Sequence, residues 1–118
     1  MKIINRVIKK LNYAFKGLRI AAITDNSFKI HFVFALPIVI SGFFLEFNQF
    51  EWVTISISIG IVLISELFNT AIEYIVKMFT CEYHELAEKL LDISAGAVLM
   101  SSILAVVLAL LIYIPHFR

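Results

Sequence analysis

The first part of the chain combines apolar and basic positions with a helical period. From Ile3 to Leu18, apolar side chains recur at spacings of three and four residues. Basic side chains occupy the remaining faces: Lys2, Arg6, Lys9, Lys10, Lys16 and Arg19. This pattern predicts an amphipathic helix over residues 1–24 that lies in a membrane interface. Charges recur every few positions, so we expect no signal peptide, which would need an uninterrupted apolar stretch.

A short polar cluster, Thr24 to Ser27, separates this helix from three apolar stretches. The uncharged runs are Ile30–Leu45, Trp52–Ser65 and Ile93–Phe117. A helix needs roughly 20 apolar residues to cross a bilayer, so the first two runs must extend into flanking residues. We therefore predict spanning helices at about residues 30–47, 52–79 and 92–115. Together with the surface helix, they form one all-α membrane domain over residues 1–118.

The distribution of basic residues predicts how these helices are oriented. Seven of the ten Lys and Arg residues lie within the first 29 positions. Cytoplasmic segments of membrane proteins are enriched in Lys and Arg, so the N-terminus should be cytoplasmic. Three crossings then place the link Glu46–Glu51 outside, the link Lys77–Asp92 inside and the C-terminus outside.

Composition strengthens the membrane assignment and excludes several other classes. Apolar residues make up 61% of the 118 residues and charged residues 16%, and the mean hydropathy is +0.94. So short a chain cannot bury this much apolar surface alone, which excludes an ordinary soluble monomer and favours an oligomer. A net charge of +1 gives no reason to expect a nucleic-acid partner. The four glycines are too widely spaced for a phosphate-binding loop.

Three polar residues stand out within the second spanning helix. Glu66, Asn69 and Glu73 are spaced i, i+3, i+7, which places them within about 60° of one another on one face. A charged side chain near the bilayer centre costs on the order of 3 kcal/mol, so this stripe should avoid lipid. It should face a polar cavity, the bundle interior or the cytoplasmic interface. The stripe could handle a cation or proton, or it could mark where the helix leaves the membrane, with Asn69 linking two helices.

Other polar residues have structural explanations. Asp25 is the type of residue that caps the start of a helix, and Asp92 could cap the third spanning helix. Cys81 and His84 form a Cys-x-x-His pair, but no second pair accompanies it, so we expect no zinc site. His31 is expected to be an interfacial residue rather than a ligand.

The stretch Glu66-Leu-Phe-Asn-Thr-Ala-Ile-Glu73 resembles a motif of the bacterial membrane-integral diacylglycerol kinase family, which includes the undecaprenol kinases. In that family the motif lies on the second spanning helix. The resemblance continues in Glu82-Tyr-His-Glu-Leu86, at Asp92 and in Tyr13-Ala-Phe-Lys-Gly-Leu-Arg19. The order of one surface helix and three spans is also similar, so the resemblance covers essentially the whole chain.

The resemblance implies transfer of the γ-phosphate of ATP, with Mg²⁺, to a lipid hydroxyl at the cytoplasmic face of the bacterial inner membrane. It also implies a homotrimeric bundle whose sites lie between subunits. Glu66 would be the general base, while Asp25, where the family usually has Glu, and Glu73 would hold the metal. The residues implied to surround the nucleotide are Arg6, Tyr13, Asp25, Glu73, Glu82, Tyr83, His84 and Asp92. Asn69 would support the site, and a supporting role for Lys77 is a separate hypothesis, because that position departs from the family pattern.

Two positions depart from the family pattern. Lys77 stands where the family usually has Asp, and Leu91 stands where it usually has Lys. Our hypothesis is that Lys77, one helical turn beyond Glu73, partly replaces the lost cation near the ATP phosphates. The alternative is that the two changes mark a weakened or non-enzymatic relative of the same fold.

The lipid acceptor is open at this stage. The overall layout favours diacylglycerol, which would become phosphatidic acid. The stretches Phe28–His31 and Ser94–Val98 look more like the undecaprenol kinases. An ion or proton conductor that uses Glu66 and Glu73 is a further, less favoured interpretation, because nothing else in the sequence requires a pore.

Overall fold

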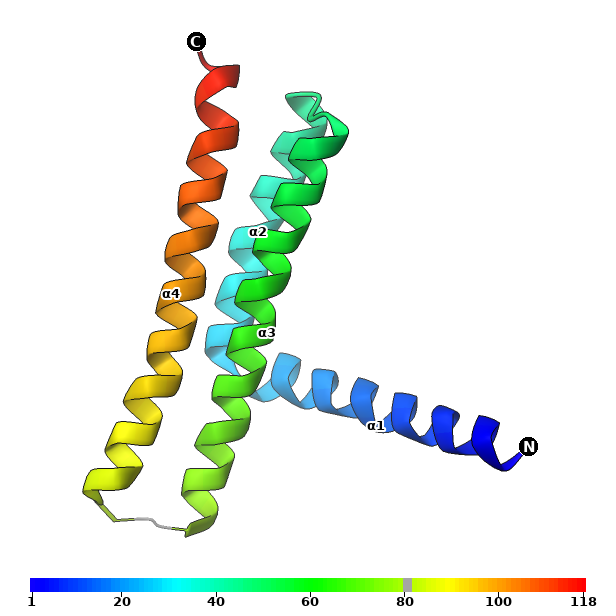
Figure 1. Ribbon diagram of the computed structural model, residues 1–118, viewed down its shortest axis with the longest axis vertical. Coiled ribbons are helices and arrows are strands. Elements are labelled where there is room, and N and C mark those ends of the chain that lie inside the picture. Colours follow the sequence, from blue (N-terminus) through cyan, green and yellow to red (C-terminus); the bar gives the residue numbers. More distant parts are fainter. Residues whose placement is uncertain (80–81) are drawn as a thin grey trace.

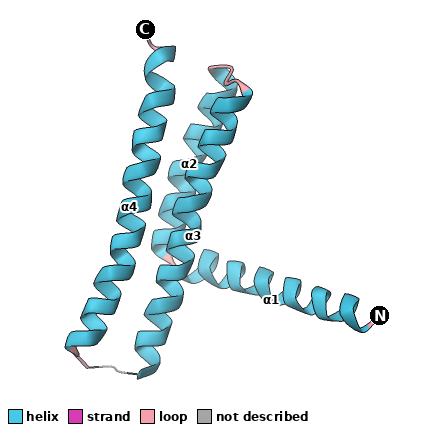
Figure 2. Ribbon diagram, in the orientation of Figure 1, coloured by secondary structure: helices cyan, strands magenta, loops and turns pink. Residues whose placement is uncertain are grey.

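A computed structural model describes residues 1–79 and 82–118 of the chain. Its four helices are α1 (Lys2–Thr24), α2 (Asn26–Phe44), α3 (Gln49–Phe79) and α4 (Glu85–His116). The described residues include no strand (Figures 1 and 2). The all-α prediction is confirmed. Cys81 lies outside the described residues, so the Cys81–His84 pair receives no structural account.

Three of the helices, α2, α3 and α4, are long and apolar enough to cross a membrane. They run side by side, whereas α1 projects away from them near one end of the bundle (Figure 1). Ala21 is the buried residue of α1, and all its other side chains are exposed. An amphipathic helix that leaves a three-helix bundle sideways suits a membrane surface. The prediction of one surface helix and three spans is therefore confirmed.

The helices begin before the apolar stretches themselves, and two polar residues define where they start. Asp25 caps α2, because its Oδ1 accepts hydrogen bonds from the backbone N–H groups of Ser27 at 2.9 Å and Phe28 at 3.2 Å. The prediction that Asp25 is a helix cap is confirmed. The prediction that Asp92 caps a helix is wrong, because α4 already begins at Glu85. His84 caps α4 instead, with Nδ1 accepting from the N–H of Leu86 at 3.2 Å.

The turn between α2 and α3 closes the end of the bundle that lies away from α1. Glu46 adopts a left-handed conformation there, with φ of 53°, and the N–H of Phe47 bonds to the carbonyl of Gly42 at 3.0 Å. This is a common way to end a helix. The buried ring of Phe47 packs against Trp52 and Tyr113. A Cβ at Gly42 would come within 2.7 Å of the Trp52 ring, so only glycine allows this close approach.

Several of the buried side chains in the described chain are polar. On α3, the buried residues include Ser58, Glu66, Asn69 and Thr70, and on α4 they include Ser94. Most large apolar side chains are exposed, as expected where the surroundings are lipid. Lipid tails are as apolar as leucine, so packing and interhelical hydrogen bonds hold such helices together. The stripe of Glu66, Asn69 and Glu73 thus faces the neighbouring helices.

Candidate active site

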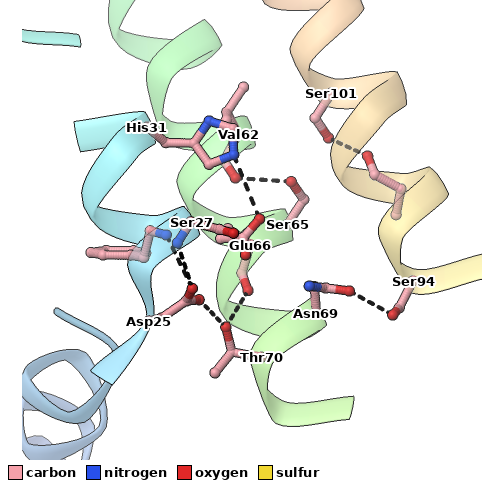
Figure 3. Close-up of polar contacts among 12 residues, drawn as sticks. Asp25, Ser27, His31, Val62, Ser65, Glu66, Asn69, Thr70, Ser94 and Ser101 are labelled. Atoms are coloured by element: carbon pink, nitrogen blue, oxygen red, sulfur yellow. Dashed lines mark hydrogen bonds and ion pairs between the residues drawn. The ribbon is translucent and has the colours of Figure 1, made fainter. Parts of the chain in front are cut away.

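Glu66 is the most deeply buried carboxylate of the predicted stripe. Its side chain is 4% exposed, and its Oε2 lies 3.6 Å from Nε2 of His31 on α2 (Figure 3). We expected His31 to be an interfacial residue rather than a ligand, and within the described chain its side chain lies beside the Glu66 carboxylate. The imidazole provides a partner for a carboxylate that would be costly to bury alone.

Thr70 connects the stripe to the start of α2. It lies one turn after Glu66, and its hydroxyl donates a hydrogen bond to Oδ2 of Asp25. The same hydroxyl is 3.0 Å from the backbone carbonyl of Glu66 (Figure 3). Asp25 therefore caps α2 with one carboxylate oxygen and contacts α3 with the other. This double role fixes the junction of α1 and α2 beside Glu66.

Asn69 links α3 to α4 and also holds Glu73. The hydroxyl of Ser94 on α4 donates to Oδ1 of Asn69 at 2.6 Å (Figure 3). The Nδ2 group of Asn69 donates to Oε1 of Glu73 at 3.1 Å. The expected link between helices is therefore present, and the same amide orients one of the two carboxylates assigned to the metal.

A polar cavity of about 270 Å³ lies where α1, α2 and α3 meet. Its lining includes Asp25, Thr70, Glu73 and Lys77. Thr70 lies at the level where α2 begins, and Glu73 and Lys77 lie farther along α3. Two carboxylates and a cation thus share one cavity at the junction of α1 and α2 with α3.

The donor set of this cavity fits a magnesium ion that is shared with a nucleotide. Mg²⁺ is commonly held by one or two carboxylates, with phosphates and water completing the shell. Asp25 and Glu73 supply two carboxylates, and each ionised carboxylate has about four acceptor positions. In the described part of the chain, no cluster of three or more His, Cys, Asp or Glu side chains could hold a metal unaided.

A second polar cavity, of about 450 Å³, opens between the ends of α3 and α4. It brings together Glu82, Tyr83, His84 and Asp92, which are four of the residues assigned to the nucleotide. A hydrogen bond to Glu88, with slight desolvation and the charge of Asp92, raises the pKa of Tyr83. The phenol therefore stays protonated near neutral pH and can donate a hydrogen bond.

Lys77 lies at the boundary of the two polar cavities, since its side chain lines both of them. Its Nζ is 5.6 Å from the centre of the Tyr74 ring, a cation–π distance. An ammonium group in this position could reach an anion that extends from one cavity into the other.

An apolar cavity of about 240 Å³ lies between α2, α3 and α4. Its lining begins at His31 and includes Val62 and Leu63, which precede Glu66 on α3. Thr70, one turn after Glu66, lines the polar cavity. Glu66 itself lines neither cavity, but along α3 it lies between the residues that line the apolar one and those that line the polar one.

Two predicted nucleotide residues are not brought to this site within one chain. Arg6 and Tyr13 lie on the part of α1 that extends away from the bundle, and Tyr13 is 70% exposed (Figure 1). Of α1, Thr24 reaches the polar cavity, where its hydroxyl lies 3.5 Å from that of Tyr74.

Sequence reasoning missed His31, Thr70 and Ser94 as parts of the site. Thr70 and Ser94 carry little signal, because hydroxyl residues are common in membrane helices and only packing shows which ones face a partner. His31 carried a usable signal, since an ionisable residue inside an apolar run is by default a candidate functional residue.

Comparisons with known proteins identify the family of the chain. The family model for prokaryotic diacylglycerol kinase matches residues 12–113. An undecaprenol kinase of Bacillus subtilis is 36% identical over 112 residues, which cover 95% of this chain and 91% of the relative. A diacylglycerol kinase of Escherichia coli K12 is 35% identical over 112 residues, with coverage of 95% and 92%. The chain belongs to the prokaryotic diacylglycerol kinase family.

Proposed function

We propose that this protein is an ATP-dependent lipid kinase that phosphorylates a membrane lipid alcohol, with diacylglycerol as the favoured acceptor. The observation that carries the proposal is the position of Glu66 between the apolar cavity and the cavity of Asp25 and Glu73. A lipid kinase needs such a boundary, because its acceptor stays in the bilayer while its phosphate donor arrives from water. Membership in the family supports the same chemistry.

In the proposed reaction, the lipid hydroxyl oxygen forms a bond to the γ-phosphorus of ATP. The bond from that phosphorus to the bridging oxygen breaks, and ADP leaves. Glu66 accepts the hydroxyl proton, because it is the buried carboxylate nearest the apolar side. Phosphoryl transfer otherwise requires positioning and neutralisation of charge rather than covalent help from the protein.

Asp25 and Glu73 are the proposed magnesium ligands, and a bound ion would neutralise charge on the phosphates. Glu82, Tyr83, His84 and Asp92 would surround the rest of the nucleotide in the adjoining cavity. Asn69 supports this arrangement by holding Glu73.

Both diacylglycerol and undecaprenol have support as the lipid acceptor. The diacylglycerol kinase of Escherichia coli and the undecaprenol kinase of Bacillus subtilis match this chain almost equally well. Undecaprenol is therefore the second candidate. A weakened or non-enzymatic relative is the third possibility, and it rests on Lys77 and Leu91.

The first prediction concerns Glu66. With purified protein in mixed micelles, labelled ATP and Mg²⁺, we expect transfer of label to diacylglycerol or to undecaprenol. Glu66→Gln should lower kcat by roughly 10²- to 10⁴-fold, the usual contribution of a general base. The lipid that gains label identifies the acceptor.

Glu51→Gln is the matched control for this experiment. Glu51 lies at the other end of α3 and also pairs with a histidine, His116, at 2.8 Å. We expect it to leave kcat unchanged. Failure of the wild-type protein to label either lipid would instead favour the non-enzymatic alternative.

The second prediction concerns Lys77, which we propose binds ATP phosphates across the two polar cavities. Lys77→Ala should raise the KM for ATP roughly tenfold, since a hydrogen bond to a charged group is worth about 1.5 kcal/mol or more. The KM for the lipid should not change. Lys89→Ala is the control, because Lys89 is 63% exposed and pairs with Glu85 on the surface. An unchanged KM for ATP in Lys77→Ala would refute this role.

We further propose that the protein works as a homotrimer in the bacterial inner membrane, with its N-terminus in the cytoplasm. The enrichment of Lys and Arg in α1 supports this orientation. The distance of Arg6 and Tyr13 from the cavities of their own chain supports sites shared between subunits, because α1 is free to reach a neighbour (Figure 1).

The third prediction tests the shared site by mixing subunits. Glu66→Gln and Arg6→Ala should each be poorly active alone, and their co-expression should restore activity. The reason is that an intact site can form from Glu66 of one subunit and α1 of the next. The control mixture combines Glu66→Gln with Glu73→Gln, whose lesions affect the same α3, and it should restore nothing. Equal behaviour of the two mixtures would contradict a site shared through α1.

A further inference from the structure

His31 has a place at the candidate site that the proposed chemistry does not yet use. Its Nε2 lies 3.6 Å from Oε2 of Glu66, and its side chain is 25% exposed. The two residues come from different helices, α2 and α3 (Figure 3). With its proton on Nε2, the imidazole is a donor and the carboxylate an acceptor.

The distance of 3.6 Å is longer than a normal hydrogen bond. Catalytic hydrogen bonds are often long without substrate and shorten when substrate is bound. The His31 imidazole is thus close enough to orient Oε2 of Glu66 once the distance between them shortens to that of a hydrogen bond.

His31 also lines the apolar cavity, where its neighbours along α2 are Phe34, Ala35 and Ile38. Glu66 itself does not line this cavity, but Val62 and Leu63, which precede it on α3, do. The Glu66 carboxylate oxygen beside His31 therefore faces a residue that belongs to the apolar cavity. Asp25, which caps α2 and accepts a hydrogen bond from the Thr70 hydroxyl, belongs instead to the polar cavity.

We propose that His31 is a positioning residue for the lipid phosphorylation reaction. It holds the Glu66 carboxylate toward the hydroxyl of the acceptor, and so acts through Glu66 rather than on the nucleotide. This inference rests on the proposed function of Glu66 as the base.

The pair of Glu51 and His116 provides an internal comparison. Their contact of 2.8 Å joins α3 and α4 at the other end of the bundle, where the His116 ring packs against Phe47. That pair lies beside an aromatic cluster and lines none of the polar or apolar cavities described above. Loss of His116 should therefore affect stability alone, whereas loss of His31 should affect catalysis.

The test measures kcat, both KM values and thermal stability for His31→Phe, His31→Gln and His116→Phe. His31→Phe keeps a planar ring but cannot donate, and should lower kcat by roughly 10- to 100-fold, because misplacing a reacting group by about 1 Å has such effects. The KM for ATP should stay constant. His31→Gln restores a donor and should recover most of kcat. His116→Phe should leave kcat unchanged even where it lowers stability.

A double variant separates positioning from simple packing. If His31 acts through Glu66, adding His31→Phe to Glu66→Gln should cause no further loss of activity. Several results would overturn the proposal: a normal kcat in His31→Phe, no recovery in His31→Gln, or a further loss in the double variant. If the wild-type protein phosphorylates lipid and His31→Phe keeps the wild-type kcat, the role of His31 is overturned but the proposed function stands. A wild-type protein without transfer would overturn both.

Discussion

A carboxylate inside a membrane-spanning helix must have partners from other helices, and the arrangement of this molecule follows from that requirement. An isolated charge near the bilayer centre costs on the order of 3 kcal/mol or more. Glu66 avoids lipid because α3 turns its polar face toward α2 and α4, where His31 faces it and Ser94 bonds to Asn69. The apolar residues of the chain are left to face lipid. At this end of the bundle, polar groups of the candidate site join the helices, while the cluster around Phe47 joins them at the other end.

Asp25 joins the start of α2 to α3. It follows α1, caps α2 and contacts Thr70 of α3. Val62 and Leu63, before this level on α3, line the apolar cavity, and Glu73 and Lys77, after it, line the polar cavity. In the proposed function, the lipid acceptor and the phosphate donor approach Glu66 from these two sides.

The sequence was most informative where local pattern determines structure. The surface helix, the three spans, the cap at Asp25 and the inward stripe all follow from periodicity and from the cost of burying charge. The cap of α4 was assigned wrongly to Asp92, because the apolar run begins eight residues after Glu85, where the helix starts. His31 was underestimated because its partner comes from a helix 35 positions away, and only packing sets that register. Arg6 and Tyr13 line neither polar cavity of their own chain, and our proposal assigns them to sites shared between subunits.

The requirement for Mg²⁺ is the most direct test of the polar cavity beside Glu66. The measurement is the Mg²⁺ concentration that gives half-maximal lipid phosphorylation, compared among the wild type, Asp25→Asn and Glu73→Gln. Asparagine still caps helices, so Asp25→Asn should keep the fold while removing one charged ligand. We predict that both variants need more Mg²⁺, and that Glu85→Gln, on the exposed start of α4, does not. An unchanged Mg²⁺ requirement in both Asp25→Asn and Glu73→Gln would contradict the assignment of this cavity to the metal and nucleotide.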